Sequence, residues 1–580
     1  MAAQLFRWTK PMLREQLSVI REEKPPTKVL KNATYLSSPR KDWLKGNIWI
    51  YEDRIVYVGK DFPANTKNTE IVDCTDKYIV PGYIEPHAHP FQLYNPHTLA
   101  EYASKRGTTT LINDNMFFFL NIEKKKALTL IEELDQLPTS MFWWCRYDAQ
   151  TEMEEEDSLF SPSNMKAWLD HPLVLQGGEL TGWPKVMHGD DTILHWMQYT
   201  KEINKPIEGH LPGASERTLT QLSVLGVNSD HEAMTGEEAL RRLDLGLITS
   251  LRYSSIRPDL PKILEDLKES EVKDYSRFIF TTDGSTPAFY KNGVIDNMIA
   301  IAIEKGVPVI DAYEMASYNV ARHYSIDDQI GMVAPGRIAH LNILDDMENP
   351  LPSSVLAKGK WVLYEGECRY PDKHFSWEEH GVYPFLVDWT LTEEDLTFSM
   401  PMGLELVNSV ILKPYQVTVD ATQDVLSSEH DESYFIMIDR HGKWRINTVI
   451  KGFATNVQGF ATTYSNTGDV VLIGKSKKDM LRAFKELKTH NGGMFLVEND
   501  EVVMSMPLTL FGAMSLECME NVMEQHEQLE QALKERGYPH DDPIYSVLFF
   551  SSTHLPYIRV TQKGIYDVHK KSVLFPSIMR

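Results

Sequence analysis

Short apolar runs, each ending in polar side chains, recur through residues 79–335 and alternate with segments long enough for helices. Eight such runs can be counted, and their lengths are those of buried strands. Eight strand–helix units in about 250 residues are typical of a (β/α)8 barrel, in which functional side chains gather at the C-terminal ends of the strands. An open parallel sheet with the same alternation is the alternative. The runs lie at 83–89, 109–114, 141–147, 173–180, 206–210, 227–232, 247–252 and 278–283.

Strand-like segments flank this central region on both sides. Residues 47–51 and 54–59 are separated by a short polar turn and predict a hairpin. A similar pattern returns after the central region, at 337–345 and 360–366. We therefore expect one small β-sandwich domain built from both flanks of the barrel.

The pattern changes after about residue 372, to mixed strands and helices. The acidic segment 516–536 alternates glutamate with apolar residues, so it predicts a solvated amphipathic helix, to which no chemistry is assigned. The fold class is therefore α/β, a (β/α)8 barrel with two accessory domains. The predicted division is 1–78 and 336–372 for the small β-domain, 79–335 for the catalytic barrel, and 373–580 for a C-terminal α+β domain.

The composition limits the partners that the chain can have. Its 580 residues are 42% hydrophobic and 24% charged, which is ordinary for globular protein, and the length exceeds that of one hydrophobic core. The formal net charge of -23 argues against nucleic acid or an anionic membrane, because either would favour a basic face. A small neutral or weakly charged substrate fits better.

The four cysteines lie far apart and form no CxxC pair, so we expect reduced, mostly buried thiols rather than a disulfide scaffold or a zinc ribbon. Residues 1–10 lack the apolar core of a signal peptide, and no apolar run approaches the ~18 residues that suggest a membrane span. The expected compartment is the cytoplasm.

His87 and His89 are the first candidates for chemistry. They end the first run of the barrel, and residues two apart on a strand point to the same side, so both can bind one metal ion. In a chain with 19 histidines, one His-x-His pair is weak evidence alone.

Four later runs end in the remaining types of metal ligand, namely Glu179, His210, His231 and Asp283. Taken singly, each has an ordinary explanation as a core or surface histidine or as a turn cap. As a set in strand order, they predict a metal site shared with the first two histidines. Histidine mixed with carboxylate suits zinc, iron(II) or manganese, and Glu179 could bridge two ions ~3.5–4 Å apart.

The expected chemistry follows from this set of ligands. A divalent ion lowers the pKa of bound water towards neutrality, and a carboxylate on the last strand can accept the proton and pass it to the leaving group. Asp283 is the candidate for that carboxylate. The reaction class is metal-assisted hydrolysis at a carbonyl-like carbon or its nitrogen analogue in a heterocycle. Three histidines in loop or helix contexts receive no role: His171, His188 and His195.

The segment Val-Pro-Gly-Tyr-Ile-Glu-Pro-His-Ala-His at 80–89 resembles the first-strand motif of the amidohydrolase superfamily, and 331–345 resembles that superfamily's return to its β-domain. Further segments are similar to the adenine deaminase family, which uses a glutamate where many relatives use a carboxylated lysine. These segments are 177–184, 208–213, 229–232, 492–499, 506–515 and 555–568.

This resemblance implies hydrolytic deamination of adenine to hypoxanthine and ammonia. It implies two divalent ions per chain, manganese foremost, with iron(II) or zinc as alternatives. Asp283 would also be the proton shuttle, Arg252 would orient the substrate, and Glu232 would be a second acid. The partner would be a nucleobase-like small molecule, and a homodimer is left open. The implied metal ligands are His87, His89, Glu179, His210, His231 and Asp283.

Three segments depart from the family's pattern. Phe-Gln-Leu at 91–93 replaces Glu-Ser-Ser, Asn-Asp-Asn-Met-Phe at 113–117 replaces Asp-Pro-His-Glu, and Tyr-Ser-Asn-Thr-Gly-Asp at 464–469 replaces His-Asp-Ser-His-Asn. If these positions shape the substrate pocket, the alternative is another amidohydrolase reaction on a related purine, a cyclic amidine or amide, or an N-acetylated amino sugar. A catalytically silent binding protein is disfavoured, because it has no need of Asp283 beside the metals.

Overall fold

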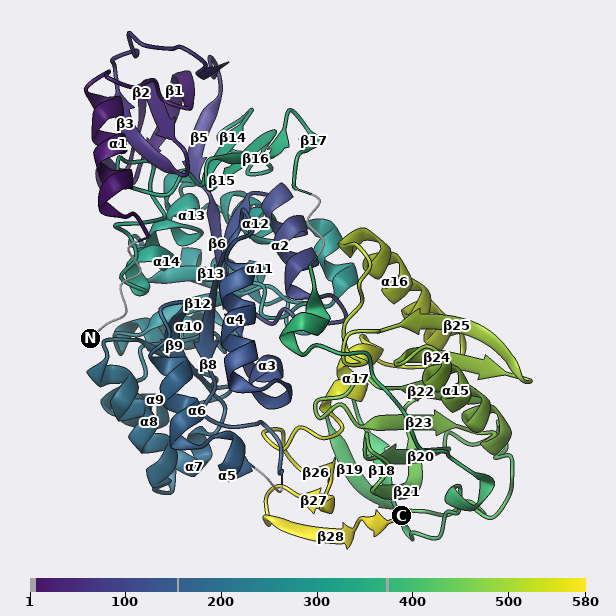
Figure 1. Cartoon of the computed structure of the whole chain (residues 1–580). Helices are drawn as coiled ribbons and strands as arrows, with labels where there is room; N and C mark the ends of the chain where they lie inside the picture. The colour runs from purple at the N-terminus through teal and green to yellow at the C-terminus, as the bar shows by residue number, and fades with distance from the viewer. Residues whose placement is uncertain (1–6, 154–155, 372–374) are drawn as a thin grey trace.

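The computed structural model describes residues 7–153, 156–371 and 375–580 (Figure 1). Most of segment 1–10 and the predicted domain boundary near residue 372 lie outside the described residues. The division of the chain at residues 78, 335 and 372 stays a prediction.

All eight predicted segments of the central region contain a strand, and the strands are parallel neighbours in chain order. They curl into a nearly closed barrel, which confirms the predicted fold class and rules out the open sheet. Within the described ranges these strands are β6 (Tyr83–Ala88), β7 (Thr108–Asp114), β8 (Ser140–Cys145), β9 (Val174–Leu180), β10 (Ile207–Gly209), β11 (Ser229–Asp230), β12 (Ile248–Arg252) and β13 (Phe278–Thr281).

Glu85 connects the first and last strands of the barrel. Its buried carboxylate accepts hydrogen bonds from Thr281 Oγ1 at 2.7 Å and from the Thr282 backbone N–H at 2.9 Å, both at the end of β13. It also accepts from the His87 backbone N–H at 2.9 Å. The end of β13 is therefore fixed against the end of β6, where the predicted metal ligands lie.

Amphipathic helices follow the strands, since their apolar positions recur at helical spacing. In α11 (Leu260–Glu269), for example, the buried residues are Leu260, Ile263, Leu264 and Leu267, which share one face. The other principal helices between the strands or after the last one are α2 (Pro96–Lys105), α4 (Lys124–Leu134), α6 (Pro162–Leu169), α8 (Asp191–Glu202), α9 (Glu216–Val224), α10 (Gly236–Asp244) and α12 (Ile295–Glu304).

The small β-domain combines strands from both flanks of the barrel. The two flanks meet where β5 (Tyr78–Pro81) pairs antiparallel with β14 (Leu341–Leu344), and the predicted hairpin is present as β2 (Asp42–Tyr51) and β3 (Arg54–Gly59). In the part of the chain that the structure describes, the remaining strands of this sheet are β1 (Lys28–Ser37), β4 (Glu70–Asp73), β15 (Ser354–Ala357), β16 (Lys360–Tyr364) and β17 (Glu367–Cys368).

The C-terminal region contains a largely antiparallel sheet with α15 (Lys477–Thr489) packed against it. A further small sheet follows near the C-terminus, with β26 (Ile558–Thr561), β27 (Gly564–Asp567) and β28 (Ser572–Pro576). Described strands of the larger sheet are β18 (Met402–Leu406), β19 (Leu412–Gln416), β20 (Ser433–Ile438), β21 (Trp444–Lys451), β22 (Gly459–Thr462), β23 (Val470–Gly474), β24 (Gly493–Glu498), β25 (Glu501–Pro507) and β29 (Ile578–Met579).

The helix predicted at 516–536 is present as α16 (Met519–Glu535), but the prediction that it is simply solvated is wrong. It packs against the barrel at the 3-10 helix η2 (Pro287–Asn292) and against β25 of the C-terminal sheet. His526 is buried in this contact and accepts a hydrogen bond from the Ala288 backbone N–H at 3.2 Å. The apolar face of the helix therefore joins the two domains.

The prediction of mostly buried cysteines is also only half right. Cys74 and Cys145 are buried, whereas Cys368 and Cys518 are exposed. Cys368 lies on β17, an edge strand with exposed side chains, and Cys518 is the residue before α16. None of the helices in the described ranges combines the length and apolar character needed to cross a bilayer.

Candidate metal centre and substrate pocket

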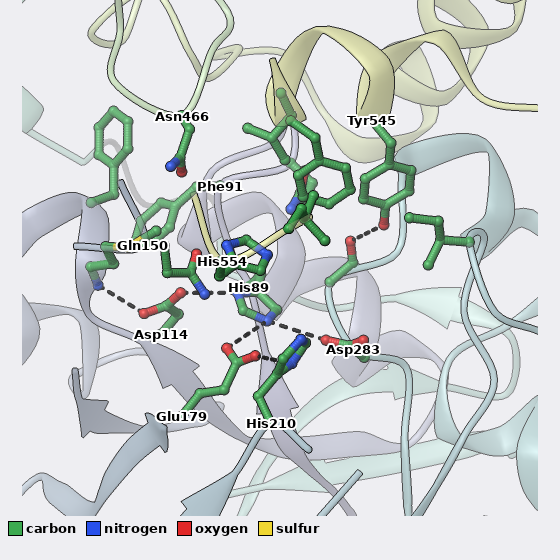
Figure 2. Close-up of a pocket in the computed structure, with 18 of the residues that line it drawn as sticks. His89, Phe91, Asp114, Gln150, Glu179, His210, Asp283, Asn466, Tyr545 and His554 are labelled. Carbon is green, nitrogen blue, oxygen red and sulfur yellow. Dashed lines mark hydrogen bonds and ion pairs between the residues drawn. The ribbon is translucent and has the colours of Figure 1, made fainter. Parts of the chain in front are cut away.

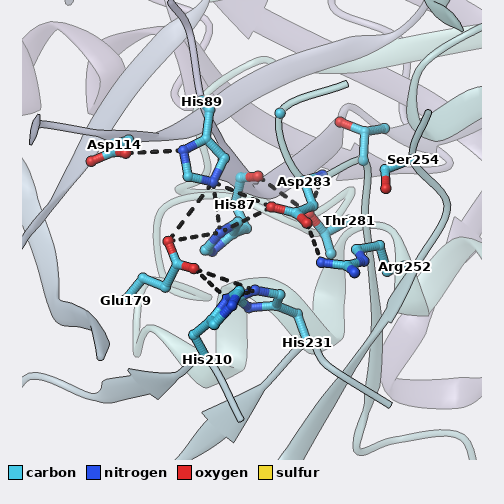
Figure 3. A network of polar contacts seen from close by, with 12 residues as sticks. His87, His89, Asp114, Glu179, His210, His231, Arg252, Ser254, Thr281 and Asp283 are labelled. Atoms are coloured by element: carbon cyan, nitrogen blue, oxygen red, sulfur yellow. Dashed lines mark hydrogen bonds and ion pairs between the residues drawn. The ribbon is translucent and has the colours of Figure 1, made fainter. Parts of the chain in front are cut away.

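The six predicted metal ligands meet at the C-terminal ends of the barrel strands (Figure 3). In the first group, Nε2 of His87 lies 3.1 Å from Nε2 of His89, and Nε2 of His89 lies 3.2 Å from Oδ1 of Asp283. Oε2 of Glu179 is 3.8 Å from Nε2 of His87. These atoms converge on one point, as the ligands of a single ion would.

A second group lies on the other side of Glu179. Its Oε1 is 2.6 Å from Nδ1 of His210 and 3.7 Å from Nε2 of His231. The two oxygens of one carboxylate thus face two separate sets of histidine nitrogens. This is the arrangement expected of a carboxylate that bridges two ions.

In three of these histidines, a carboxylate contacts Nδ1, the ring nitrogen that does not face the predicted metal site. Glu208 contacts Nδ1 of His87 at 2.8 Å and Nδ1 of His231 at 3.2 Å, and Asp114 contacts Nδ1 of His89 at 2.9 Å. A carboxylate at Nδ1 favours the tautomer that leaves Nε2 free to bind a metal. The donor set, of imidazole and carboxylate, suits zinc, iron(II) or manganese, so these residues fit a divalent metal.

Arg146 connects two carboxylates beside the first group of ligands, Asp114 and Glu179. Its buried guanidinium donates to Asp114 through Nε, at 3.0 Å, and through Nη2, and its Nη1 lies 2.7 Å from Oε2 of Glu179. Burial opposes ionisation of Glu179, but the charges of Arg146 and His210 outweigh it and hold the pKa of this carboxyl well below its usual range. Glu179 is therefore ionised and fixed in place.

Asp283 and Glu232 both accept a hydrogen bond from the guanidinium of Arg252. Nη1 of Arg252 donates to both, to Glu232 at 2.7 Å, and Arg257 contacts the second oxygen of Glu232 at 2.7 Å. Burial opposes ionisation, but Arg252 holds the pKa of Asp283 well below its usual range, and Arg252 with His210 lowers that of Glu232 to about 2. Both groups are therefore ionised, and Arg252 contacts both carboxylates.

Gly284, the residue after Asp283, lies against the side chain of His89. The backbone is left-handed at both residues, with φ of +43° at Asp283 and +58° at Gly284. A Cβ on Gly284 would lie 2.7 Å from the side chain of His89. Glycine is therefore required at this position for both conformation and space.

Four of the predicted ligands, His89, Glu179, His210 and Asp283, line a cavity of about 340 Å³, and the buried His87 and His231 lie next to them (Figure 2). We call the charged cluster the floor. It consists of the six predicted ligands with Asp114, Arg146, Glu208, Glu232 and Arg252. Barrel loops and the C-terminal domain together supply the remaining lining of the cavity.

The three segments that depart from the family's pattern come together beside the floor, and we call them the wall. Phe91 stacks on Phe117 with ring centroids 5.1 Å apart, and Tyr464 donates a hydrogen bond to Gln92. The wall thus joins two barrel loops to the C-terminal domain. Its residues are Phe91, Gln92, Met116, Phe117, Tyr464, Ser465 and Asn466.

Sequence reasoning missed several members of the site. Glu208 lies two residues before His210, so the same alternation that paired His87 with His89 was a usable signal. Arg146 is the next-to-last residue of the third run, whereas His554 enters the pocket from the C-terminal domain and had no local signal. The three histidines without an assigned role lie elsewhere: His171 bonds to Glu132, and His188 and His195 are exposed.

Comparison with known proteins agrees with this geometry. A model of the amidohydrolase family matches residues 78–362, and a model of the adenine deaminase C-terminal domain matches residues 409–572. A protein of Halalkalibacterium halodurans, provisionally named as an adenine deaminase, is 62% identical over the full length of both chains. One of Bacillus subtilis with the same provisional name is 53% identical, again over both full chains. A crystal structure of an adenine deaminase aligns with TM-score 0.44 and 17% identity, covering 58% of this chain and 99% of the other.

The barrel and its ligand cluster define the class, the metal-dependent amidohydrolases, which hydrolyse carbon–nitrogen bonds other than peptide bonds. Within that class, the chain belongs to the adenine deaminase family.

Proposed function

We propose that this enzyme deaminates adenine hydrolytically, giving hypoxanthine and ammonia. The observation that carries the proposal is the convergence of His87, His89 and Asp283 with a glutamate whose two oxygens face separate histidine groups. The names of the full-length relatives indicate adenine as the substrate.

The centre would hold two divalent ions, manganese foremost, with Glu179 between them. The first would be bound by His87, His89, Glu179 and Asp283, and the second by Glu179, His210 and His231. When bound, such ions supply Lewis acidity, which makes water a better nucleophile at neutral pH.

Asp283 would move the proton. It is ionised, as a proton acceptor must be, and its Oδ1 lies 3.2 Å from Nε2 of His89, beside the predicted metal site where water would be activated. As the water oxygen bonds to C6, Asp283 takes one proton and delivers it to the exocyclic nitrogen, the C6–N bond breaks and ammonia leaves. The second proton of the water ends on N1 of hypoxanthine.

Arg252 and Glu232 would orient the base. Arg252 keeps Asp283 and Glu232 at fixed positions, and an ionised Glu232 can accept a hydrogen bond from an N–H of the purine. The substrate would be a free nucleobase in the cytoplasm, with a homodimer left open as the assembly.

The direct test is to purify the chain with manganese, add adenine and follow ammonia and hypoxanthine. Equal formation of both products is expected. A second candidate is a different cyclic amidine or amide, favoured by the wall, where the departing segments line the cavity. Turnover of such a compound without release of ammonia from adenine would replace the first proposal by the second.

A further inference from the structure

Residues 542–555 of the C-terminal domain line part of the pocket and are fixed to the barrel at both ends. At the first end, Asp542 accepts a hydrogen bond from Thr286 Oγ1 at 2.8 Å. Tyr545, in α17 (Pro543–Phe549), donates to the carbonyl of Gly284 at 2.9 Å, directly beside Asp283. This end of the segment is thus held by the loop that carries the predicted proton shuttle.

The second end is held by the loop after β8. Thr151 Oγ1 donates to the carbonyl of Ser551 at 2.7 Å, and the Thr553 backbone N–H donates to the carbonyl of Gln150 at 3.0 Å. Because both ends are fixed, the residues between them keep a defined position over the floor. His554 follows the second anchor directly.

His554 lines the cavity next to a predicted metal ligand (Figure 2). Its ring is nearly perpendicular to that of His210, with centroids 5.8 Å apart, and Phe549 packs on it at 6.2 Å. Nδ1 of His554 is buried and has no hydrogen-bond partner among the described residues. The side chain therefore has no structural bond that accounts for a histidine at this place.

The unpartnered nitrogen indicates the tautomer. A buried N–H without an acceptor costs more than a buried lone pair without a donor, so Nδ1 is best left unprotonated. The ring hydrogen then resides on Nε2, which leaves Nε2–H as the group available to a ligand. A purine offers suitable acceptors in the lone pairs of its ring nitrogens.

We propose that His554 is a substrate-binding residue of the C-terminal domain, which donates a hydrogen bond from Nε2–H to a ring nitrogen of the bound base. The proposal rests on the function proposed above. It makes the C-terminal domain part of the recognition site, since this contact selects a heterocycle with an acceptor at the matching position.

The test compares binding of hypoxanthine, by titration calorimetry, to the manganese-loaded wild type, to H554F and to H554Q. H554F keeps a ring without a donor, and H554Q restores a donor of similar reach. We expect H554F to bind about tenfold more weakly, H554Q to recover part of that loss, and both to keep the wild-type metal content. H569F, at an exposed histidine of the same domain, is the matched control and should bind as the wild type does.

Several results would overturn the proposal. These are unchanged binding by H554F, a glutamine variant as weak as the phenylalanine variant, or loss of metal in H554F, which would assign His554 a structural role beside His210. If H554F does not fold, the wild type is titrated with deaza analogues of hypoxanthine, each lacking one ring acceptor. One analogue should then bind about tenfold more weakly, and equal affinities would contradict the hydrogen bond.

Failure of the proposed function has a different signature. If the wild type binds hypoxanthine but releases no ammonia from adenine, the deaminase activity is contradicted. The comparison of the wild type with the His554 variants can still be interpreted in that case. A wild type that binds no hypoxanthine contradicts the role of His554, whatever its turnover.

Discussion

The floor of the pocket is a network of charged groups that are linked to one another, whereas the wall is a mixture of aromatic and neutral polar side chains. On the floor, Glu208 holds two histidines and Arg146 holds two carboxylates, so that few groups can move independently. On the wall, Phe91 and Phe117 are held by stacking and Tyr464 by a single hydrogen bond to Gln92.

This difference indicates that the floor and the wall have different functions. Charged groups at fixed positions in a buried site stabilise developing charge and bind metal, which are the requirements of the chemical step. Apolar and aromatic surfaces contribute to shape and mainly decide which ring enters. Changes on the floor should therefore affect every substrate alike, and changes on the wall should alter the ranking of substrates.

The largest effect is expected from metal removal. Dialysis against a chelator should reduce ammonia release to the uncatalysed background, because the proposed chemistry depends on metal bound by the predicted ligands, and manganese should restore it. The melting temperature should fall at the same time, since bound ligand stabilises the folded state. Full activity in a preparation shown by elemental analysis to be metal-free would contradict the account.

Removing the proposed proton shuttle should have the next largest effect. D283N should lower kcat for adenine by about 10²–10⁴, because an amide cannot accept the proton of the attacking water. D274N, at an exposed position, is the matched control and should behave as the wild type. If D283N kept the wild-type kcat with its metal bound, another group would have to move the proton.

Replacing Glu208, which contacts two of the predicted histidine ligands, should weaken metal binding. In E208Q, an amide replaces the carboxylate that contacts Nδ1 of His87 and His231, and its NH2 group opposes one of their N–H groups. Affinity for manganese should fall by about 10–100-fold, as measured by competition with a chelating dye. E237Q, on an exposed helix surface, serves as the control. Unchanged affinity would mean that the imidazoles need no support from Glu208.

A change on the wall should be smaller and selective. F117A removes the ring that stacks on Phe91 and should raise KM for adenine by less than about tenfold, with little change in kcat or metal content. Its ranking of substituted purines should differ from that of the wild type. F62A, at an exposed position, is the control. A collapse of kcat in F117A would show that the wall takes part in the chemical step.

The last effect is on stability and not on turnover, and it concerns the base of the wall loop. Burial raises the pKa of Asp469 from 3.8 to about 7. The folded form therefore binds a proton that the unfolded chain releases, and the stabilisation is lost as pH rises from about 4 through 7, by at most about 1.4 kcal/mol per pH unit. D469N should flatten this part of the profile of unfolding free energy against pH, measured with urea, and D388N should not. Identical profiles for D469N and wild type would contradict the assignment.

The sequence predicts the barrel well because each buried parallel strand is a short apolar run, and each run ends at the edge where side chains become functional. For the same reason, His210 and Asp283 could be proposed as members of one ligand set, although neither is evidence for a metal site when taken singly. Glu208 could have been predicted from the same alternation, because it lies two residues before His210. Arg146 could not be given a role, because its two partners come from different strands and only folding brings them together.

The C-terminal contribution was beyond sequence reasoning. The apolar face of α16 predicts a buried side but does not say what covers it, and the barrel surface at η2 is its partner. His554 likewise enters the pocket only because the segment around it is anchored on two barrel loops. Neither segment carries a sequence signal that says which surface of the other domain it will contact.

One measurement tests the division between floor and wall most directly: kcat/KM for adenine and for two substituted purines, together with manganese content, in E208Q and F117A. The account predicts that E208Q loses metal and lowers all three values by a similar factor, while F117A keeps its metal and changes their ratios. Changed ratios in E208Q, or a uniform loss with loss of metal in F117A, would contradict it.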